Sequence, residues 1–310
     1  MKKIFFVVNP RSSGGSTRKR WEKLMPVLRS EGISFDWSYT AGPYTAPDIA
    51  AGAVREGYDL IVAVGGDGTI YEVLNGMMDQ DRALDERASL AVLPSGTGCD
   101  FARSMKISGS EGNFLKLLKE GKPVAIDVGR AEFAGHQGET TVRYFLNVAE
   151  AGLGGETVAR VNRTAKVFGG FASFLWGAVV SIALFTDKYL KIHLDDRDYR
   201  EGRYTLVACG NGKFFGGGMK ICPNAEMDDG WLDVVALMGT TKWDLISNLP
   251  LVYRGEHLDH WRVWHRRAKK VTISSPDHTT LVNIDGEQPG KLDARFTILP
   301  KAINLLVENG

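Results

Sequence analysis

Short apolar runs alternate with segments of helical periodicity over the first 128 residues. Four strands are predicted, at residues 4–8, 34–40, 60–64 and 90–93. The run at 60–64 is apolar throughout, which is typical of a parallel strand covered on both faces. Between the strands, Trp21, Leu24 and Leu28 share one helical face, and residues 47–56 form a second helix with Pro47 at its start. This alternation predicts a parallel sheet flanked by helices.

After residue 128 the pattern becomes rich in strands. The predicted strands lie at residues 141–148, 189–194, 204–208, 232–237, 271–274, 280–284 and 295–299. A short helix is expected at 242–249. We therefore expect an α/β N-terminal nucleotide-binding domain with a parallel sheet (1–128) and a mainly antiparallel β-sandwich or barrel as the C-terminal domain (129–298). The C-terminal segment 299–310 is expected to pack back on the first domain.

Composition and charge narrow the class of protein. The 310 residues are 44% hydrophobic and 24% charged, with a formal net charge of +1, so no global field draws the chain to nucleic acid. The three cysteines form no paired motif, which favours a reducing cytoplasm over a disulfide framework. The apolar start breaks at Asn9-Pro10 and is interpreted as a buried strand, not a signal peptide.

One segment, residues 167–186, approaches the length of a membrane span, which needs about 20 apolar residues. Glycine and serine dilute its hydrophobicity. A buried or membrane-touching helix is therefore the favoured interpretation, and a true span is the alternative.

Two glycine-rich loops follow predicted strands. The first reads Val64-Gly65-Gly66-Asp67-Gly68-Thr69 and the second Pro94-Ser95-Gly96-Thr97-Gly98-Cys99-Asp100. Glycine allows the backbone to approach a phosphate, and a helix that begins there presents its N–H groups. Both also suit simple strand-to-helix turns with capping aspartates. Neither matches a Walker A loop or GxGxxG. Because two such loops follow neighbouring strands, a phosphate cradle is the stronger interpretation.

These loops resemble those of the diacylglycerol kinase and lipid kinase family, which read GGDGT-x-x-E-V-x-N-G and P-x-G-T-x-N-D-F-A-R. The resemblance extends through the second half of the chain. Its further elements are Asp127-Val128-Gly129, Asn147, Asn211-Gly212, Phe215-Gly216-Gly217-Gly218-Met219, Pro223-Asn224-Ala225, Asp228-Asp229-Gly230-Trp231-Leu232-Asp233 and Asp285-Gly286-Glu287.

The resemblance implies roles for acidic residues. Glu287 matches the general base that takes the proton of the lipid hydroxyl as it attacks phosphorus. Asp67, Asp100, Asp127 and Asp229 match an acidic network that organises Mg²⁺ and water.

A separate structural Mg²⁺ site is implied at Glu226, Asp229 and Trp231, with backbone carbonyls from the first and last. Without the resemblance, Glu287 and Asp228-Asp229-Gly230 would be interpreted as turn residues.

The resemblance also implies the nucleotide contacts. They are Asn9, Pro10, Arg11, Ser12, Ser13, Thr40, Gly66, Asp67, Gly68, Thr69, Ile70, Tyr71, Glu72 and Thr97. Two residues depart from the family pattern: Tyr71 and Cys99 both stand where asparagine is usual. The departures leave the nucleotide preference open.

The function implied is transfer of the γ-phosphate of ATP, with Mg²⁺, to a hydroxyl of a diacylglycerol-like lipid. The protein would then be cytoplasmic, transiently at the inner face of the membrane, with no nucleic-acid partner; a homodimer stays open. A soluble NAD kinase, a non-catalytic nucleotide or lipid sensor and, more weakly, a dinucleotide oxidoreductase are the alternatives.

Histidine and arginine in the second half suggest two further sites. His257-x-x-His260 lacks the ligands that would complete a zinc site. Residues 260–267 mix basic and aromatic side chains; a strand with a solvated basic face is favoured over RNA binding, and a membrane-touching patch is the second hypothesis.

Overall fold

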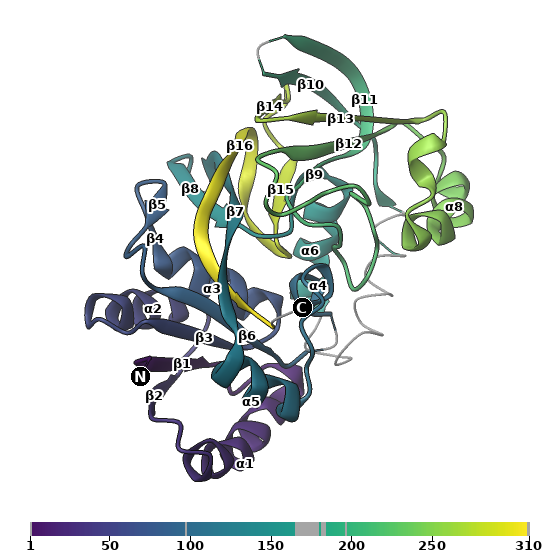
Figure 1. Ribbon diagram of the computed structural model, residues 1–310. Coiled ribbons are helices and arrows are strands. Elements are labelled where there is room, and N and C mark those ends of the chain that lie inside the picture. The colour runs from purple at the N-terminus through teal and green to yellow at the C-terminus, as the bar shows by residue number, and fades with distance from the viewer. Residues whose placement is uncertain (1, 97, 165–179, 181–183, 196, 309–310) are drawn as a thin grey trace. The chain divides into compact units, whose positions relative to one another are not determined.

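The computed structural model describes residues 2–96, 98–164, 180, 184–195 and 197–308, and it divides into two compact units (Figure 1). Unit 1 comprises Met1–Asp127 and Lys301–Gly310, and unit 2 comprises Val128–Pro300. Two strands, β7 (Lys122–Gly135) and β16 (Glu287–Val307), carry the chain from one unit into the other.

Unit 1 is an α/β unit built on parallel strands. Its other elements are β1 (Ile4–Val8), η1 (Ser13–Gly15), α1 (Ser16–Ser30), β2 (Phe35–Tyr39), α2 (Ala46–Arg55), β3 (Leu60–Gly65), α3 (Asp67–Met77), β4 (Met78–Asp79), β5 (Arg82–Ala83), β6 (Ser89–Pro94), α4 (Asp100–Ser104) and α5 (Glu111–Glu120). The strands lie in the order β2, β1, β3, β6, and each neighbouring pair is parallel. Asn304 and Leu305 of β16 pair with β6, also in parallel.

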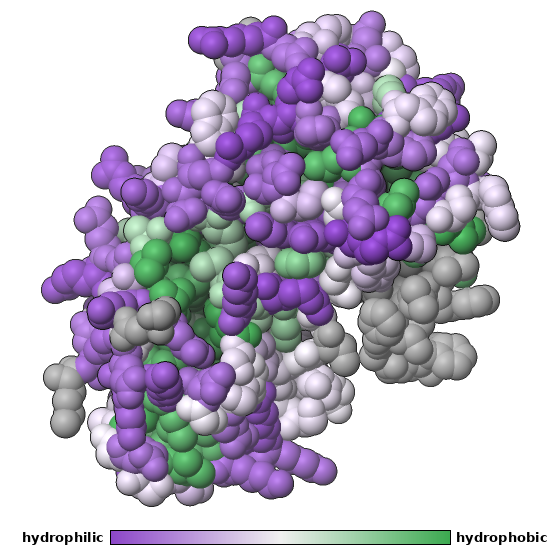
Figure 2. Space-filling model, turned by 45° about the vertical axis from the view of Figure 1, so that its right-hand side comes forward, coloured by the Kyte–Doolittle hydropathy of each residue, from purple (hydrophilic) through white to green (hydrophobic). Residues whose placement is uncertain are grey.

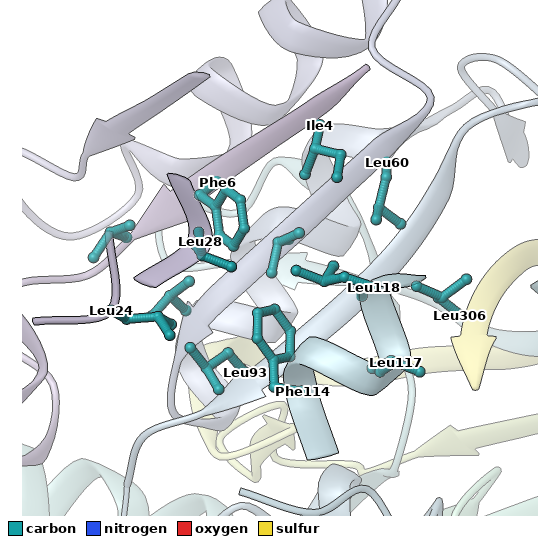
Figure 3. Packing of buried hydrophobic residues seen from close by; sticks show 14 of the residues in the cluster. Ile4, Phe6, Leu24, Leu28, Leu60, Leu93, Phe114, Leu117, Leu118 and Leu306 are labelled. Atoms are coloured by element: carbon teal, nitrogen blue, oxygen red, sulfur yellow. The ribbon is translucent and has the colours of Figure 1, made fainter. Parts of the chain in front are cut away.

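Helices cover both faces of this sheet. On one face, α1 and α5 pack against alternate strand residues, and Figure 3 shows Phe6 and Leu93 beside Leu24, Leu28 and Phe114. On the other face, α2 and α3 contact β1 and β3. Successive side chains of a strand point to opposite faces, so both sets must be apolar. Each fully buried Leu or Phe contributes about 1.5–3 kcal/mol. This is why the run at 60–64 lacks polar positions.

Unit 2 is built mainly from antiparallel strands. Its elements are β8 (Thr140–Phe145), β9 (Val148–Gly152), α6 (Leu153–Thr164), β10 (Lys188–Leu194), β11 (Asp198–Gly210), β12 (Leu232–Met238), α8 (Lys242–Arg254), η2 (His257–Asp259), β13 (Val263–Ala268), β14 (Lys270–Ser274) and β15 (Leu281–Ile284). Antiparallel pairing joins β13, β12, β11, β10, β14 and β16 in that order. β9 pairs with both β11 and β15, and β15 pairs with β16.

The prediction of a single strand at residues 141–148 is wrong in one respect. The chain forms β8 and β9 instead, and the break falls at Leu146 and Asn147. The carboxylate of Asp285 accepts hydrogen bonds from the backbone N–H groups of Leu146, Asn147 and Val148, at 2.7, 2.9 and 2.9 Å. A side chain distant in sequence thus replaces a neighbouring strand as the partner of these groups.

The helix predicted at 242–249 is longer than expected, because α8 extends to Arg254. A capping box fixes its start: Thr241 accepts a hydrogen bond from the backbone of Asp244, whose side chain accepts one in return. Most of the apolar segment 167–186 lies outside the described residues. Within the described part of the chain, no helix has the length and apolar character required to cross a membrane.

Candidate active site

The first glycine-rich loop joins β3 directly to α3. A Cβ added to Gly65 would lie 2.3 Å from Oγ1 of Thr69, so only glycine lets the helix begin this close to the strand. Thr69 is buried, and its Oγ1 accepts a hydrogen bond from the side-chain amide of Asn9 at 3.1 Å. The ends of β1 and β3 are therefore joined by a direct hydrogen bond between two predicted site residues.

Asp67, the first residue of α3, joins the two glycine-rich loops. Its two carboxylate oxygens accept hydrogen bonds from the backbone N–H groups of Asp100 and Phe101, at 2.9 and 3.1 Å. Burial raises the pKa of Asp67, and these two bonds and the charge of Arg103 oppose the rise. Asp67 thus caps the first turn of α4, and each of its oxygens keeps a second lone pair.

The second loop leads into α4. Its Asp100 is buried and forms an ion pair with Arg103. Cys99 adopts a left-handed backbone conformation just before the helix, and burial raises the pKa of its thiol to about 12. A thiol of this pKa is almost entirely protonated at neutral pH and is a poor nucleophile. Thr97 lies outside the described residues.

A chain of hydroxyl groups connects the loop after β1 to the end of β6. Oγ of Ser12 donates to Oγ1 of Thr17 at 2.7 Å, and Oγ1 of Thr17 lies 2.6 Å from Oγ of Ser95. Ser95 also donates its backbone N–H to the carbonyl of Gly65 at 2.7 Å. Three loops at the carboxyl ends of parallel strands are thus held together. The sequence analysis missed Thr17 and Ser95 in this role, since isolated hydroxyl residues carry no recognisable spacing.

The remaining nucleotide candidates of α3 have structural contacts. The carboxylate of Glu72 accepts hydrogen bonds from the backbone N–H groups of Tyr44 and Ala46, at 3.0 and 3.2 Å, at the start of α2. The side chains of Ile70 and Tyr71 are buried in the core. The departure from the family pattern at Tyr71 therefore places an aromatic ring in the core, where it packs instead of facing solvent.

Two further candidates of unit 1 are buried beside strand ends. Thr40 donates its backbone N–H to the carbonyl of Val8 at 2.9 Å. Asp127 accepts a hydrogen bond at 2.7 Å from the backbone N–H of Lys301, where the two chain crossings meet. Asp67 and Asp100 therefore lie next to each other in the two glycine-rich loops. The carboxylate of Asp127, by contrast, accepts its hydrogen bond from the backbone of Lys301.

In unit 2, Glu287 follows a two-residue turn between β15 and β16. Both turn residues have positive φ, 48° at Asp285 and 90° at Gly286, the geometry that Asp-Gly favours in a tight hairpin. Asp285 anchors the turn through its three hydrogen bonds to residues 146–148. The backbone N–H of Gly286 donates to Oδ1 of Asn283 at 2.9 Å. Glu287 is half-buried, and the turn that precedes it is held by these hydrogen bonds.

The metal site implied at Glu226, Asp229 and Trp231 lies in the loop before β12. Oδ1 of Asp229 accepts the backbone N–H of Trp231 at 3.0 Å, and Oδ2 forms an ion pair with Arg267. Glu226 is exposed. Carboxylate and carbonyl oxygens suit Mg²⁺, but the ion would share Asp229 with a guanidinium. Among the described residues, no group of three His, Cys, Asp or Glu side chains is arranged to hold a metal.

The first histidine of the HxxH pair lies in the core of unit 2. His257 is buried, with Nε2 3.0 Å from the carbonyl oxygen of Ile221, and burial lowers its pKa. His257 is therefore a core residue that joins η2 to the loop before β12.

Glu150 is a fully buried carboxylate that the sequence analysis missed. It lies on β9, opposite Asn283 of β15, and faces Gly154 and Gly155 at the start of α6. Hydrogen-bonding groups of Asn283, Gly154 and Gly155 lie close enough to oppose part of the effect of burial, although among the described residues none has full hydrogen-bond geometry to the carboxylate. Burial raises the pKa of Glu150 to about 7. The signal in the sequence was a single acid inside the apolar run Val148-Ala149-Glu150-Ala151.

Comparison with known proteins relates this geometry to a family. The family model "Diacylglycerol kinase catalytic domain" matches residues 3–131, and "YegS C-terminal NAD kinase beta sandwich-like domain" matches residues 147–307. A diacylglycerol kinase of Staphylococcus aureus (strain JH9) is 31% identical over 258 residues, which are 83% of this chain and 77% of that protein. This chain belongs to the diacylglycerol kinase family.

The family fixes the class of reaction. The members are lipid kinases, so this kinase is a phosphotransferase with an alcohol group as acceptor, and the resemblance seen in the loop sequences is confirmed. A full-length relative from Staphylococcus saprophyticus subsp. saprophyticus, also a diacylglycerol kinase, is 27% identical over 309 residues, 99% of this chain and 96% of that one.

Solved structures share the fold. A diacylglycerol kinase from Bacillus anthracis str. Sterne superposes with a TM-score of 0.70 and 22% identity, covering 98% of this chain and 96% of that one. Yeast NADH kinase in complex with NADH gives a TM-score of 0.56 and 11% identity, covering 99% and 84% of the two chains. The two-part fold with a β-sandwich-like second part is therefore common to lipid and NADH kinases.

Proposed function

We propose that this protein transfers the γ-phosphate of ATP to a free hydroxyl of a diacylglycerol-like lipid, with Mg²⁺ as the metal ion. The observation that carries this proposal is the bonding of Asp67 to the first turn of α4, which unites the two glycine-rich loops of a diacylglycerol kinase family member. ATP supplies the phosphoryl group, and Mg²⁺ offsets the negative charge that develops during transfer.

The loops of unit 1 suit the binding of phosphate. They lie at the carboxyl ends of β1, β3 and β6, where parallel sheets bind ligands. A Cβ added to Gly66 would meet no atom within 4 Å, so the backbone is open to approach at the start of α3. The predicted contacts at Asn9–Ser13, Thr40 and Gly66–Thr69 are part of the proposal, with Ile70, Tyr71 and Glu72 acting through the backbone.

The acidic residues have different roles in this proposal. Asp67 holds two N–H groups and offers its remaining lone pairs to Mg²⁺, with Asp100 beside it. Asp127 and Asp229 complete the proposed network. Glu287 takes the proton of the acceptor hydroxyl, a task for which a half-buried carboxylate on a tight hairpin is well positioned. Asp229 with the carbonyls of Glu226 and Trp231 holds the proposed structural Mg²⁺.

The lipid acceptor implies the setting of the reaction. A kinase whose acceptor has long acyl chains must take that acceptor from a membrane surface. We infer that the protein is cytoplasmic and contacts the inner face of the membrane transiently, without nucleic acid as a partner; a homodimer is compatible with this.

The test is transfer of labelled γ-phosphate from ATP, with Mg²⁺, to a panel of lipids in mixed micelles. Diacylglycerol, phosphatidylglycerol and sphingoid bases form the panel, with NAD and soluble sugars as controls. Labelled phosphatidic acid is the expected product. Label on NAD would assign the chain to the NAD kinase class, and ATP binding without transfer to any acceptor would indicate a sensor.

A further inference from the structure

One side of α8 is apolar and exposed to solvent. Trp243, Ile246 and Tyr253 are 76%, 47% and 38% exposed, and Pro250 between them is exposed as well. Spacings of three, four and three residues place these side chains on the same side of a helix. No residue of α8 is fully buried. Hydrophilic side chains cover most of the surface visible in Figure 2, with apolar ones in smaller patches between them.

The opposite side of α8 anchors the helix on unit 2. Val252 packs against the core cluster that contains Val148, Leu206 and Val235, together with Leu258 of η2. Val252 also accepts the backbone N–H of Lys220 at 3.1 Å, and a glycine in left-handed conformation, Gly255, ends the helix. The side of α8 that carries Trp243 and Ile246 is therefore a second apolar side of the helix, in addition to the side that packs on the core of unit 2.

A second exposed tryptophan is connected to the start of α8 through Arg262. Trp261 is 72% exposed, and the guanidinium of Arg262 lies 4.1 Å from the centre of its ring. Arg262 donates a hydrogen bond to the carbonyl of Gly239, three residues before the helix, and its charge reaches Asp244 in the first turn. We name the set of Trp243, Ile246, Pro250, Tyr253, Trp261 and Arg262 the tryptophan patch.

Charges of both signs lie around the tryptophan patch. Lys242 and Arg254 border the patch, and Arg262 belongs to it. Of the acids nearby, Asp244 lies in the capping box within reach of the charge of Arg262, and Asp259 of η2 is exposed. Glu256 forms an ion pair with Arg254 at 2.7 Å. Tryptophan beside arginine or lysine is the combination found where proteins meet the head groups of a bilayer. The acceptor of this kinase family is a lipid, so a phospholipid membrane fits this surface better than a second protein does.

We propose that the tryptophan patch docks this protein on a phospholipid membrane, with α8 lying in the plane of the interface. The proposal rests on the lipid-kinase function above and adds the surface through which the enzyme reaches its acceptor. The apolar side chains enter the boundary between head groups and acyl chains, and Arg262 and Lys242 face lipid phosphates.

The test measures, by sedimentation, the binding of the protein to vesicles of phosphatidylcholine and phosphatidylglycerol. The double variant Trp243→Ser/Ile246→Ser is expected to lower the partition coefficient at least ~10-fold, because both substitutions remove apolar groups from the interface. The matched control is Tyr199→Ser, which removes a 47% exposed aromatic side chain of β11 and is expected to bind as wild type.

A second readout does not depend on binding strength. Vesicles with brominated acyl chains quench tryptophan fluorescence on contact, and Trp243→Phe should remove much of the quenching while it preserves binding. Unchanged binding of the double variant, or no binding by the wild type, would overturn the proposal. Loss of a dimer in the double variant with vesicle binding intact would assign the patch to a second copy and overturn it too.

The outcome is separable from that of the proposed function. The double variant should phosphorylate a short-chain, water-soluble diacylglycerol at the wild-type rate, and only its rate on vesicle-embedded substrate should fall. If no lipid is phosphorylated by the wild type, the proposed function fails, and the vesicle measurements still decide the role of the patch.

Discussion

The carboxylates of unit 1 and unit 2 are supported in different ways. In unit 1, Asp67 both fastens the second loop through two backbone N–H groups and is proposed to bind Mg²⁺. In unit 2, these tasks fall to different residues: Asp285 accepts the three N–H groups that anchor the hairpin, and Glu287, two residues later, is the proposed base. Glu150 is a third case, buried with no hydrogen-bond partner among the described residues.

The difference determines what a substitution can show. Removal of the Asp67 charge disturbs loop geometry and chemistry together, because one side chain serves both. Removal of the Glu287 charge should leave the fold intact, since its neighbour carries the anchoring bonds. Loss of the Glu150 charge should improve stability, since the groups of Asn283, Gly154 and Gly155 offset only part of the cost of its burial.

The largest effect is expected for Asp67→Asn. The amide keeps one oxygen but turns an NH₂ group toward an N–H donor, and the negative charge at the start of α4 is lost. Mg²⁺-dependent turnover should fall at least ~10²–10⁴-fold. Steady-state kinetics over a range of Mg²⁺ concentrations measures this, with the melting temperature as a measure of loop damage. Near-normal turnover would remove Asp67 from the site.

Glu287→Gln should lower turnover by ~10²–10⁴-fold, the usual contribution of a general base, while ATP binding and the melting temperature stay unchanged. Asp285→Asn is the matched control, since it removes the same charge two residues earlier and is expected to lower stability by about 1.5–3 kcal/mol through weaker bonds to the backbone. Equal turnover of Glu287→Gln and wild type would exclude Glu287 as the base.

The smallest effect is on stability alone. The pKa of Glu150 is raised from 4.5 to about 7 in the folded state, so the native protein binds the proton more tightly than the unfolded chain. The free energy of unfolding therefore falls as the pH rises from about 4.5 to 7, by about 1.4 kcal/mol for each unit of pKa shift.

Glu150→Gln should abolish this dependence. Urea unfolding at pH 5 should distinguish the variant from wild type only slightly, whereas at pH 8 the variant should be more stable by a few kcal/mol. Equal stability of the two proteins at pH 8 would show that Glu150 has compensating interactions in the native state.

The alternation of strands and helices in unit 1 could be predicted because a parallel strand covered on both faces needs an apolar side chain at each position, as at Ile61 and Val62. The two glycine-rich loops could be found for a similar reason: a steric demand such as that at Gly65 acts within a few residues, so it leaves a local signal.

Contacts between distant residues were not predictable in this way. The break between β8 and β9 depends on Asp285, about 140 residues later, and the bond between Thr17 and Ser95 spans 78 residues. The role of Glu72 as the cap of α2 was likewise hidden, because the two backbone groups that it accepts precede it by more than 25 residues.

The sequence by itself determined the class of fold, the loops and the family, since these depend on local periodicity, on steric demands within a turn and on motifs. Only the tertiary structure decided which acids fasten loops, which acids are fully buried, and that α8 has an apolar side exposed to solvent. Burial and hydrogen bonding depend on which elements pack together, and a helix with two apolar sides has the same composition whether one side or both are covered.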